Sequence, residues 1–294
     1  MDLAAQTLQF LFSGITNGAI YGLIALGFTI IYNATEVINF AQGELVMLGG
    51  MIMIALSKGT NLPLPAGFVI SVSIVSIVGA SFERFTIRPL KNPTQIGIII
   101  ITIGVSILLK GVAMFIWGKE TLSSRPFSHS PPIHVGSATL DPQSLWILGI
   151  TFGILLLLQL FYQKTITGKA MRACAFNKRA AGLVGIPTQK MILLSFVLSA
   201  AMGAAAGVAI TPITMCSYDM GTILGLKGFC AVVLGGLGST IGSVVGGFIL
   251  GIVESLGAGL ISSSLRDAIA FVLLLGMLFV RPQGIFGIKE VKKI

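Results

Sequence analysis

The sequence predicts an all-α integral membrane protein, a polytopic helical bundle of about eight full spans plus one broken half-helix. The first observation is composition, because 54% of the 294 residues are hydrophobic and only 10% are charged. Soluble domains carry about 25% charged residues. The second is a succession of apolar stretches long enough to cross a bilayer, and the third is a marked asymmetry of charge between alternate loops. We treat residues 1–294 as a single transmembrane domain.

The formal net charge of +9 follows from the placement of the basic residues. Most of them fall in three segments that topology would place on one side, and these are 84–91, 163–190 and 281–293. Short basic loops are retained in the cytoplasm, so the N-terminus is expected outside and the C-terminus inside. No basic residue precedes the first apolar run, so no cleavable signal peptide is expected. The charge therefore indicates membrane topology, and nucleic-acid binding is not needed to explain it.

The first expected span covers residues 7–32 and has Gly14, Gly18 and Gly22 at intervals of four. This spacing places glycine on one helical face, where a neighbouring helix can approach closely. A polar corner at 33–35 leads to a second span, 36–57, whose beginning carries carboxylates and amides in an apolar context.

The remaining spans are expected, in order, at 66–85, 96–117, 144–162, 191–213, 241–260 and 266–280. A proline-rich outer loop, 118–142, separates the fourth from the fifth. Gly235, Gly236 and Gly238 interrupt a glycine-rich region, so a short helix near 223–234 should break before the next span. Lys110 lies inside the fourth span and must extend to the interface or find an acceptor.

The segment 163–190 is the one long polar interruption with dense positive charge, and it has no Asp or Glu. Helix formers occupy 168–184, and Gly185 and Pro187 mark the end. An amphipathic helix on the membrane surface is expected, with Met171, Cys174, Ala175 and Ala181 on its apolar face. We interpret it as a docking element for a cytoplasmic protein. A topology determinant without a partner is the alternative.

Two groups of intramembrane polar residues are candidates for a translocation path, since such groups are costly in lipid unless they face protein or water. Asn39, Gln42 and Glu44 lie close together at the start of the second span, and Glu254 lies in the glycine-rich region. The first three could instead cap the second helix or hold it to its neighbours. Glu254 could instead pair with Lys227, which would make both residues structural.

Other chemistry is weakly represented. The three cysteines have neither paired nor metal-type spacing and should be free and buried. His129 and His134 lack the neighbouring ligands of a metal site, so no metal is expected. Neither Gly-Lys pair is followed by the Ser or Thr of a phosphate-binding loop. The chain is therefore expected to be a transport subunit and not an enzyme, and to bind no cofactor itself.

Several stretches together resemble the permease of branched-chain amino acid ATP-binding-cassette importers, specifically the LivH-type subunit. They occur in the family's order over about residues 7–288 and read GITNGAIYGLIALGFTIIYNATEVINFAQGELVMLGG, FERFTIRPL, ITIGVSILLKGVAMFIWG, GKAMRACAFNKRAAGLVGI, AVVLGGLGSTIGSVVGGFILGIVESL and RPQGIFG. Lys110 departs from the pattern, which would have an uncharged polar residue there. Importers of urea, short amides and other amino acids, polar ones included, have permeases of similar pattern.

The resemblance implies a location in the bacterial inner membrane and a complex with a second permease, two ATPase subunits that bind ATP and Mg, and a periplasmic substrate-binding protein. It also implies that the loop before the sixth span holds a coupling helix, here 168–185. The residues implied in ATPase contact are Arg172, Ala173, Asn177, Ala180, Ala181 and Gly185. A different class stays open: an ion-coupled secondary carrier in which Glu44, Glu254 or Lys227 exchanges protons or binds ions, as the broken helix would allow.

Overall fold

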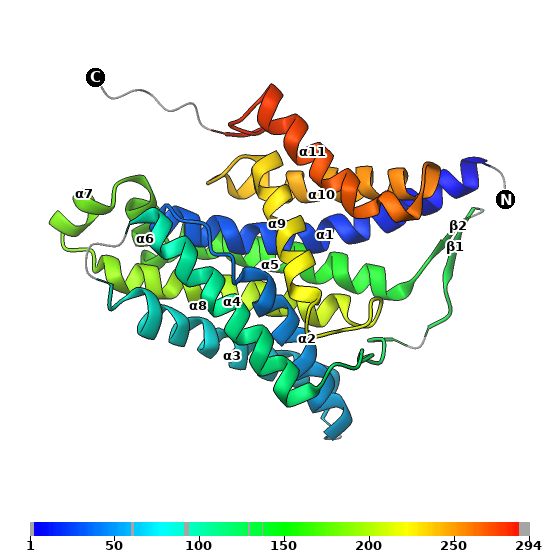
Figure 1. Cartoon of the computed structure of the whole chain (residues 1–294), viewed down its shortest axis with the longest axis horizontal. Coiled ribbons are helices and arrows are strands. Elements are labelled where there is room, and N and C mark those ends of the chain that lie inside the picture. The colour runs from blue at the N-terminus through cyan, green and yellow to red at the C-terminus, as the bar shows by residue number, and fades with distance from the viewer. Residues whose placement is uncertain (1–2, 60–61, 91–93, 129, 137, 288–294) are drawn as a thin grey trace.

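The computed structural model describes residues 3–59, 62–90, 94–128, 130–136 and 138–287, and these are overwhelmingly helical (Figure 1). The long helices are α1 (Leu3–Thr35), α2 (Gln42–Gly59), α3 (Leu64–Phe82), α4 (Gln95–Trp117), α5 (Pro142–Lys164), α8 (Thr188–Ile210), α9 (Met220–Gly235), α10 (Thr240–Leu260) and α11 (Arg266–Val280). The shorter elements are α6 (Ile166–Phe176), α7 (Lys178–Leu183), the π-helix η1 (Glu83–Ile87), the 3₁₀-helix η2 (Ser263–Leu265) and the strands β1 (Ile133–Val135) and β2 (Ala138–Leu140).

Within the described ranges, seven helices are long and apolar enough to cross a membrane, one fewer than the full spans expected from sequence. The difference is α2, which begins at Gln42 and not at Glu36. The chain between α1 and α2 is not helical, and Glu36 has a φ of 58°. With 18 residues, three of which are the polar Gln42, Glu44 and Lys58, α2 is not among the seven apolar spans. The β1–β2 hairpin in the loop between α4 and α5 was not predicted.

The helices form an internal repeat that the sequence did not reveal. The units α1–α4 and α8–α11 pack reciprocally: α1 lies against α9 and α10, and α8 lies against the equivalent helices α2 and α3. The first helices of the two units, α1 and α8, run in opposite directions (Figure 1). This is the arrangement of inverted repeats in transporters, and α5, α6 and α7 connect the two units.

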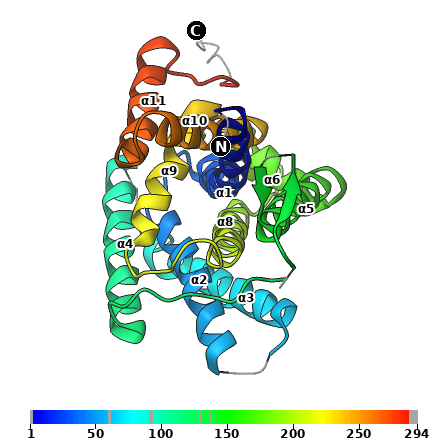
Figure 2. The same cartoon turned by 90° about the vertical axis from the view of Figure 1, so that its right-hand side faces the viewer.

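The helix α1 is the centre of the bundle (Figure 2). In its most apolar stretch 89% of the residues are buried, whereas the corresponding fraction is 17% for α4 and 6% for α11. The peripheral helices therefore present broad apolar faces to lipid or to other subunits.

The predicted glycine face of α1 is confirmed, and its partner is α10. A Cβ atom on Gly14 would stand 2.7 Å from the Cα of Ile252, and one on Gly18 would stand 2.7 Å from the Cα of Phe248. Gly247 and Gly251 make the reciprocal approach to α1 from α10. Backbones this close gain dispersion contacts that larger side chains would prevent.

The predicted break after the short helix α9 is also confirmed. Gly236 and Gly238 adopt φ values of 105° and 87°, which L-residues rarely adopt. The chain after α11 returns to this turn, where the N–H groups of Ile285 and Phe286 each donate at 2.9 Å to the carbonyls of Leu234 and Gly235. The motif RPQGIFG therefore satisfies the otherwise free carbonyls at the end of α9.

Alanine substitutions at Gly18 and at Gly153 test the α1–α10 contact. Gly153 lies on α5 with no atom within 4 Å of an added Cβ, so the two changes differ in packing and not in helix propensity. We expect Gly18→Ala to lower stability by about 1–3 kcal/mol through overpacking. Gly153→Ala should be neutral or stabilising by up to about 1 kcal/mol. Chemical unfolding in detergent measures the stability of both variants. Equal changes in the free energy of unfolding would contradict the packing argument.

Candidate functional site

Asn39 initiates α2. Its Oδ1 accepts a hydrogen bond from the N–H of Ala41 at 3.1 Å, and its backbone carbonyl accepts one from the N–H of Gln42 at 3.1 Å. Its Nδ2 is buried and has no hydrogen-bond partner among the described residues. The side chain thus acts as a cap at the point where the non-helical segment becomes helical.

Gln42 joins three helices. Its Nε2 donates to the carbonyl of Ser199 on α8 at 3.1 Å, and its Oε1 lies 2.6 Å from Ser199 Oγ. The same hydroxyl lies 2.8 Å from the carbonyl of Gly27 on α1. A Cβ on Gly27 would collide with Gln42 Nε2. These contacts are the ones expected if Gln42 is a structural residue that holds α2 to its neighbouring helices.

Glu44 faces other helices, α4 and α9, at the place where α2 and α9 begin side by side. Its side chain is 1% exposed, and its Oε1 accepts from Ser106 Oγ at 3.2 Å and from Thr222 Oγ1 at 3.1 Å. Its Oε2 has no hydrogen-bond partner in the described part of the chain. The three polar residues of this stretch consequently do not converge on one polar face. Lys110, the departure from the family pattern, has its Nζ 5.7 Å from the ring centroid of Tyr218.

Glu254 is the centre of a charge network. Its Oε1 accepts from Lys227 Nζ at 2.9 Å, which is the structural alternative that the sequence left open, and also from Arg266 Nε at 2.6 Å and Tyr21 OH at 3.0 Å. Lys227 Nζ also lies 2.7 Å from Asp267 Oδ1. The formal charges of these groups cancel, which is how buried charge is tolerated.

The network extends from the core to the surface. Glu254 is fully buried, whereas the side chain of Asp267 is 59% exposed. Sequence analysis missed Tyr21, Arg266 and Asp267. An Arg-Asp pair at the start of an apolar span was the available signal, but the distance of Tyr21 along the chain gave none.

The segment 163–190 contains two helices, α6 and α7, where the sequence predicted one over 168–185. The break is at Asn177, whose backbone is extended at φ −157° and ψ 101°. Its Oδ1 accepts from the N–H of Ala180 at 3.0 Å, so the predicted contact residue is the N-cap of α7. Thr165 caps α6 in the same way, since its Oγ1 accepts from the N–H of Gly168 at 2.9 Å.

The apolar face of this segment is largely as predicted. Met171, Cys174 and Ala181 are buried against the bundle, whereas Ala175 is exposed. All three cysteines of the chain are free and buried, as expected. Burial raises the pKa of the Cys174 thiol, so it stays protonated near neutral pH.

The residues implied in ATPase contact differ in their exposure. Ala173, Asn177, Ala180 and Gly185 are exposed, but Ala181 is only 4% exposed and faces the bundle. Four large apolar side chains that sequence analysis did not single out are exposed on the segment, and one of them, Ile166, is 87% exposed at the start of α6. The other three lie further along. Their exposed fractions are 94% for Phe176, 89% for Leu183 and 77% for Val184.

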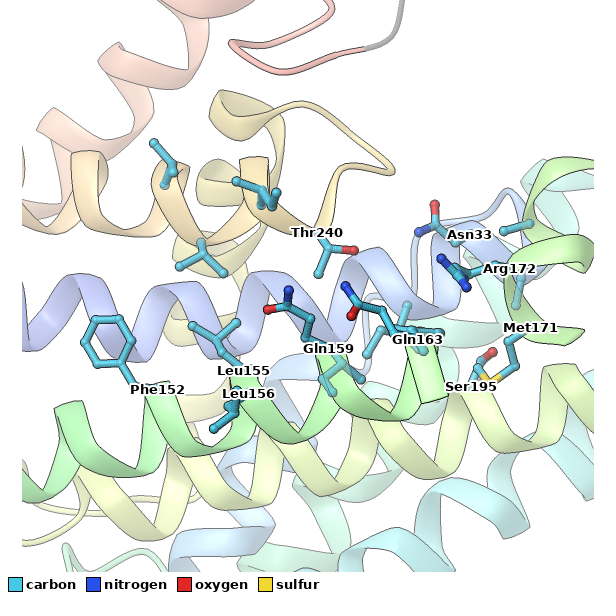
Figure 3. A pocket seen from close by; sticks show the side chains of 18 residues that line it. Asn33, Phe152, Leu155, Leu156, Gln159, Gln163, Met171, Arg172, Ser195 and Thr240 are labelled. Atoms are coloured by element: carbon cyan, nitrogen blue, oxygen red, sulfur yellow. The ribbon is translucent and has the colours of Figure 1, made fainter. Parts of the chain in front are cut away.

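A cavity of about 690 Å³ opens between α5 and α10, beside α1 and α6 (Figure 3). Its polar end carries Arg172 close to Asn33, with Gln159 and Gln163 nearby. Arg172 therefore belongs to this cavity, and its guanidinium has no hydrogen-bond or ion-pair partner among the described residues.

Among the described residues, no group of three or more His, Cys, Asp or Glu side chains could hold a metal ion. His129, one of the two histidines considered, lies outside the described residues.

A bundle of apolar helices built as an inverted repeat, with balanced charge in its core and an ordered basic segment at one end, defines the class as multi-pass membrane transport proteins. The family is given by comparison. Residues 10–278 match the model of the branched-chain amino acid transport system permease component. The chain belongs to this family.

Known relatives agree over nearly the full length. The chain is 36% identical to the high-affinity branched-chain amino acid transport system permease protein LivH of Escherichia coli K12, over 98% of this chain and 97% of that protein. It is 34% identical to BraD of Pseudomonas aeruginosa, over 98% of each chain. The autoinducer 2 import system permease protein LsrC of Salmonella choleraesuis is 28% identical over 94% of this chain and 78% of that protein.

Neutral replacements of Glu254 and Asp267 test the charge network, because each removes one negative charge from it. We expect Glu254→Gln to destabilise the protein by about 3–5 kcal/mol, since a buried partner is lost. Asp267→Asn should lower the free energy of unfolding by at most about 1 kcal/mol, because Asp267 is largely exposed and Lys227 retains its ion pair with Glu254. Chemical unfolding in detergent measures both. A larger loss for Asp267→Asn would show that Glu254 does not hold the network together.

Proposed function

We propose that this chain is a permease subunit of an ATP-binding-cassette importer that carries branched-chain amino acids across the bacterial inner membrane. The observation that carries the proposal is similarity to LivH over 98% of the chain. A second permease, two ATPase subunits that bind ATP and Mg, and an extracytoplasmic substrate-binding protein complete the importer. The N-terminus lies outside and the C-terminus in the cytoplasm, in keeping with the basic loops.

In this proposal the segment 163–190 couples ATP hydrolysis to transport. Phe176 at the end of α6, Leu183 at the end of α7 and Val184 after it are apolar and exposed, as expected of groups that insert into a partner's cleft. The exposed Ala173, Asn177, Ala180 and Gly185 border them, and Arg172 lies at the inner edge. Because α6 packs on α5, α1 and α8, a displacement of the segment would reach the centre of the bundle.

The translocation path is proposed near the junction where α2 and α9 begin. Glu44 Oε2 is a buried acceptor without a partner among the described residues, and a solute ammonium group could use it once the helices separate. Asn39 lies just before this junction, and its Nδ2 has no hydrogen-bond partner among the described residues. Gln42 could contact a solute only after its hydrogen bonds to Ser199 break. Glu254 contributes by holding α10 and α11 beside the path. A permease supplied by a binding protein needs only weak affinity of its own.

The broken α9–α10 hairpin and the buried Glu254 are the features that favour an ion-coupled carrier instead. The hydrogen bonds of Glu254 argue against it, because Oε1 is already used by Lys227, Arg266 and Tyr21. Its Oε2 has no hydrogen-bond partner among the described residues, but a cation there would be repelled by Lys227 and Arg266. A proton there would neutralise Glu254 and leave the two cations with Asp267 alone, an unbalanced charge that is costly in the core.

Mild-detergent purification of the tagged chain from native membranes, followed by an ATP hydrolysis assay, tests the assembly. We expect ATPase subunits and a second permease to co-purify. Reconstituted complex should take up leucine in preference to urea, acetamide or glutamine when its binding protein is supplied. Leucine uptake by the chain alone, dependent on a proton gradient, would establish the carrier.

The double variant Phe176→Ser with Leu183→Ser tests the coupling surface. Both side chains are almost fully exposed, so folding and membrane insertion should be unaffected, whereas uptake should fall at least about tenfold, a loss of roughly 1.4 kcal/mol in coupling. Met215→Ser is the matched control, because Met215 is 67% exposed at the opposite end of the chain's bundle. Wild-type uptake by the double variant, with ATPase retained, would remove the coupling assignment.

A further inference from the structure

The cavity between α5 and α10 is amphipathic along its length. One wall is formed by Phe152, Leu155 and Leu156 of α5, and the other by residues of α10 that include Ile241 and Val244 (Figure 3). Leu156 is 59% exposed and Ile241 is 71% exposed, so the walls are apolar surfaces that the described chain leaves uncovered.

The polar end of the cavity favours an anion. Arg172 is the one charged side chain among the described residues that line it. Gln159 and Gln163 also line the cavity, and their amides face the same space (Figure 3). Asn33 is also present, with its Nδ2 donating to the carbonyl of Gly238 at 3.1 Å. A cation with amide donors beside it, at the end of an apolar groove, suits a ligand with an acidic head and a long apolar tail.

We propose that this cavity binds one anionic phospholipid. The phosphate lies at Arg172 and the amides of Gln159 and Gln163, and an acyl chain runs between the apolar walls of α5 and α10. Basic pockets between transmembrane helices are a recurrent form of lipid headgroup site. A volume of about 690 Å³ accommodates a headgroup with the adjoining part of its chains.

A branched-chain amino acid fits the same cavity less well. The described lining contains no carboxylate, so nothing offers an anionic partner to an ammonium group. The bound lipid would also have a mechanical effect. It would connect α6, through Arg172, to α1 and α10, and would fix the position of the segment 163–190 relative to the bundle.

Native mass spectrometry of the delipidated full chain tests the site, with phosphatidylglycerol and phosphatidylcholine of identical acyl chains as probes. We expect wild-type protein to retain phosphatidylglycerol at about fivefold lower concentration than phosphatidylcholine, the preference that one cation provides. Arg172→Gln should abolish that preference, and Arg172→Lys should keep part of it. Lys169→Gln is the matched control, because Lys169 is exposed on the same helix outside the cavity.

A second pair of variants tests the apolar wall without altering charge. Leu156→Trp should fill the groove and reduce binding of both lipids, whereas Leu160→Trp, on the same helix outside the cavity, should not. Equal affinity of wild-type protein for the two lipids would overturn the proposal, as would equal losses in Arg172→Gln and Lys169→Gln. Displacement of phosphatidylglycerol by leucine would show a solute site instead, and its loss on assembly of the complex would show that a protein subunit occupies the groove.

Discussion

The close contact between α1 and α10 is the interaction on which the rest of the structure depends. Helices in lipid gain no hydrophobic free energy from packing on one another, so their association requires close backbone approach. Gly14 and Gly18 on α1 and Gly247 and Gly251 on α10 provide it. This contact makes α1 the buried axis of the bundle and places Tyr21 beside Glu254. The hydroxyl of Tyr21 can reach the charge network because the two backbones lie so close.

Two polar connections join helices in the core of the bundle, and they have different chemistry. Gln42 on α2, in the first half, meets Ser199 on α8, in the second half, through neutral hydrogen bonds. In the second half Lys227 on α9, the equivalent of α2, meets Glu254 on α10 as an ion pair. Neutral hydrogen bonds are cheaper to rearrange than a buried ion pair. The junction around α2 is therefore the part of the core better suited to open, and Glu44 lies there.

The two surfaces of the segment 163–190 bind different partners in the proposals above. Its outer surface, with Phe176 and Leu183, faces away from the bundle and suits a protein partner. Its inner surface, with Met171 and Arg172, faces the cavity between α5 and α10. Asn177 separates the two helices and lets them take different directions. A lipid on the inner side and an ATPase on the outer side would act on the same short segment.

The sequence by itself determined the class, the family and most of the helices, because a bilayer allows few backbone solutions and apolar length is directly readable. It also determined the glycine face of α1 and the break after α9, since glycine spacing is local, and it offered the pairing of Lys227 with Glu254 as one of two alternatives. Tertiary structure alone decided which helix meets that glycine face, the late start of α2 and the repeat relating α2 to α9. It also separated Gln42 from Glu44 and turned Ala181 inward. These features depend on neighbours distant in the chain, whose positions no periodicity of the sequence encodes.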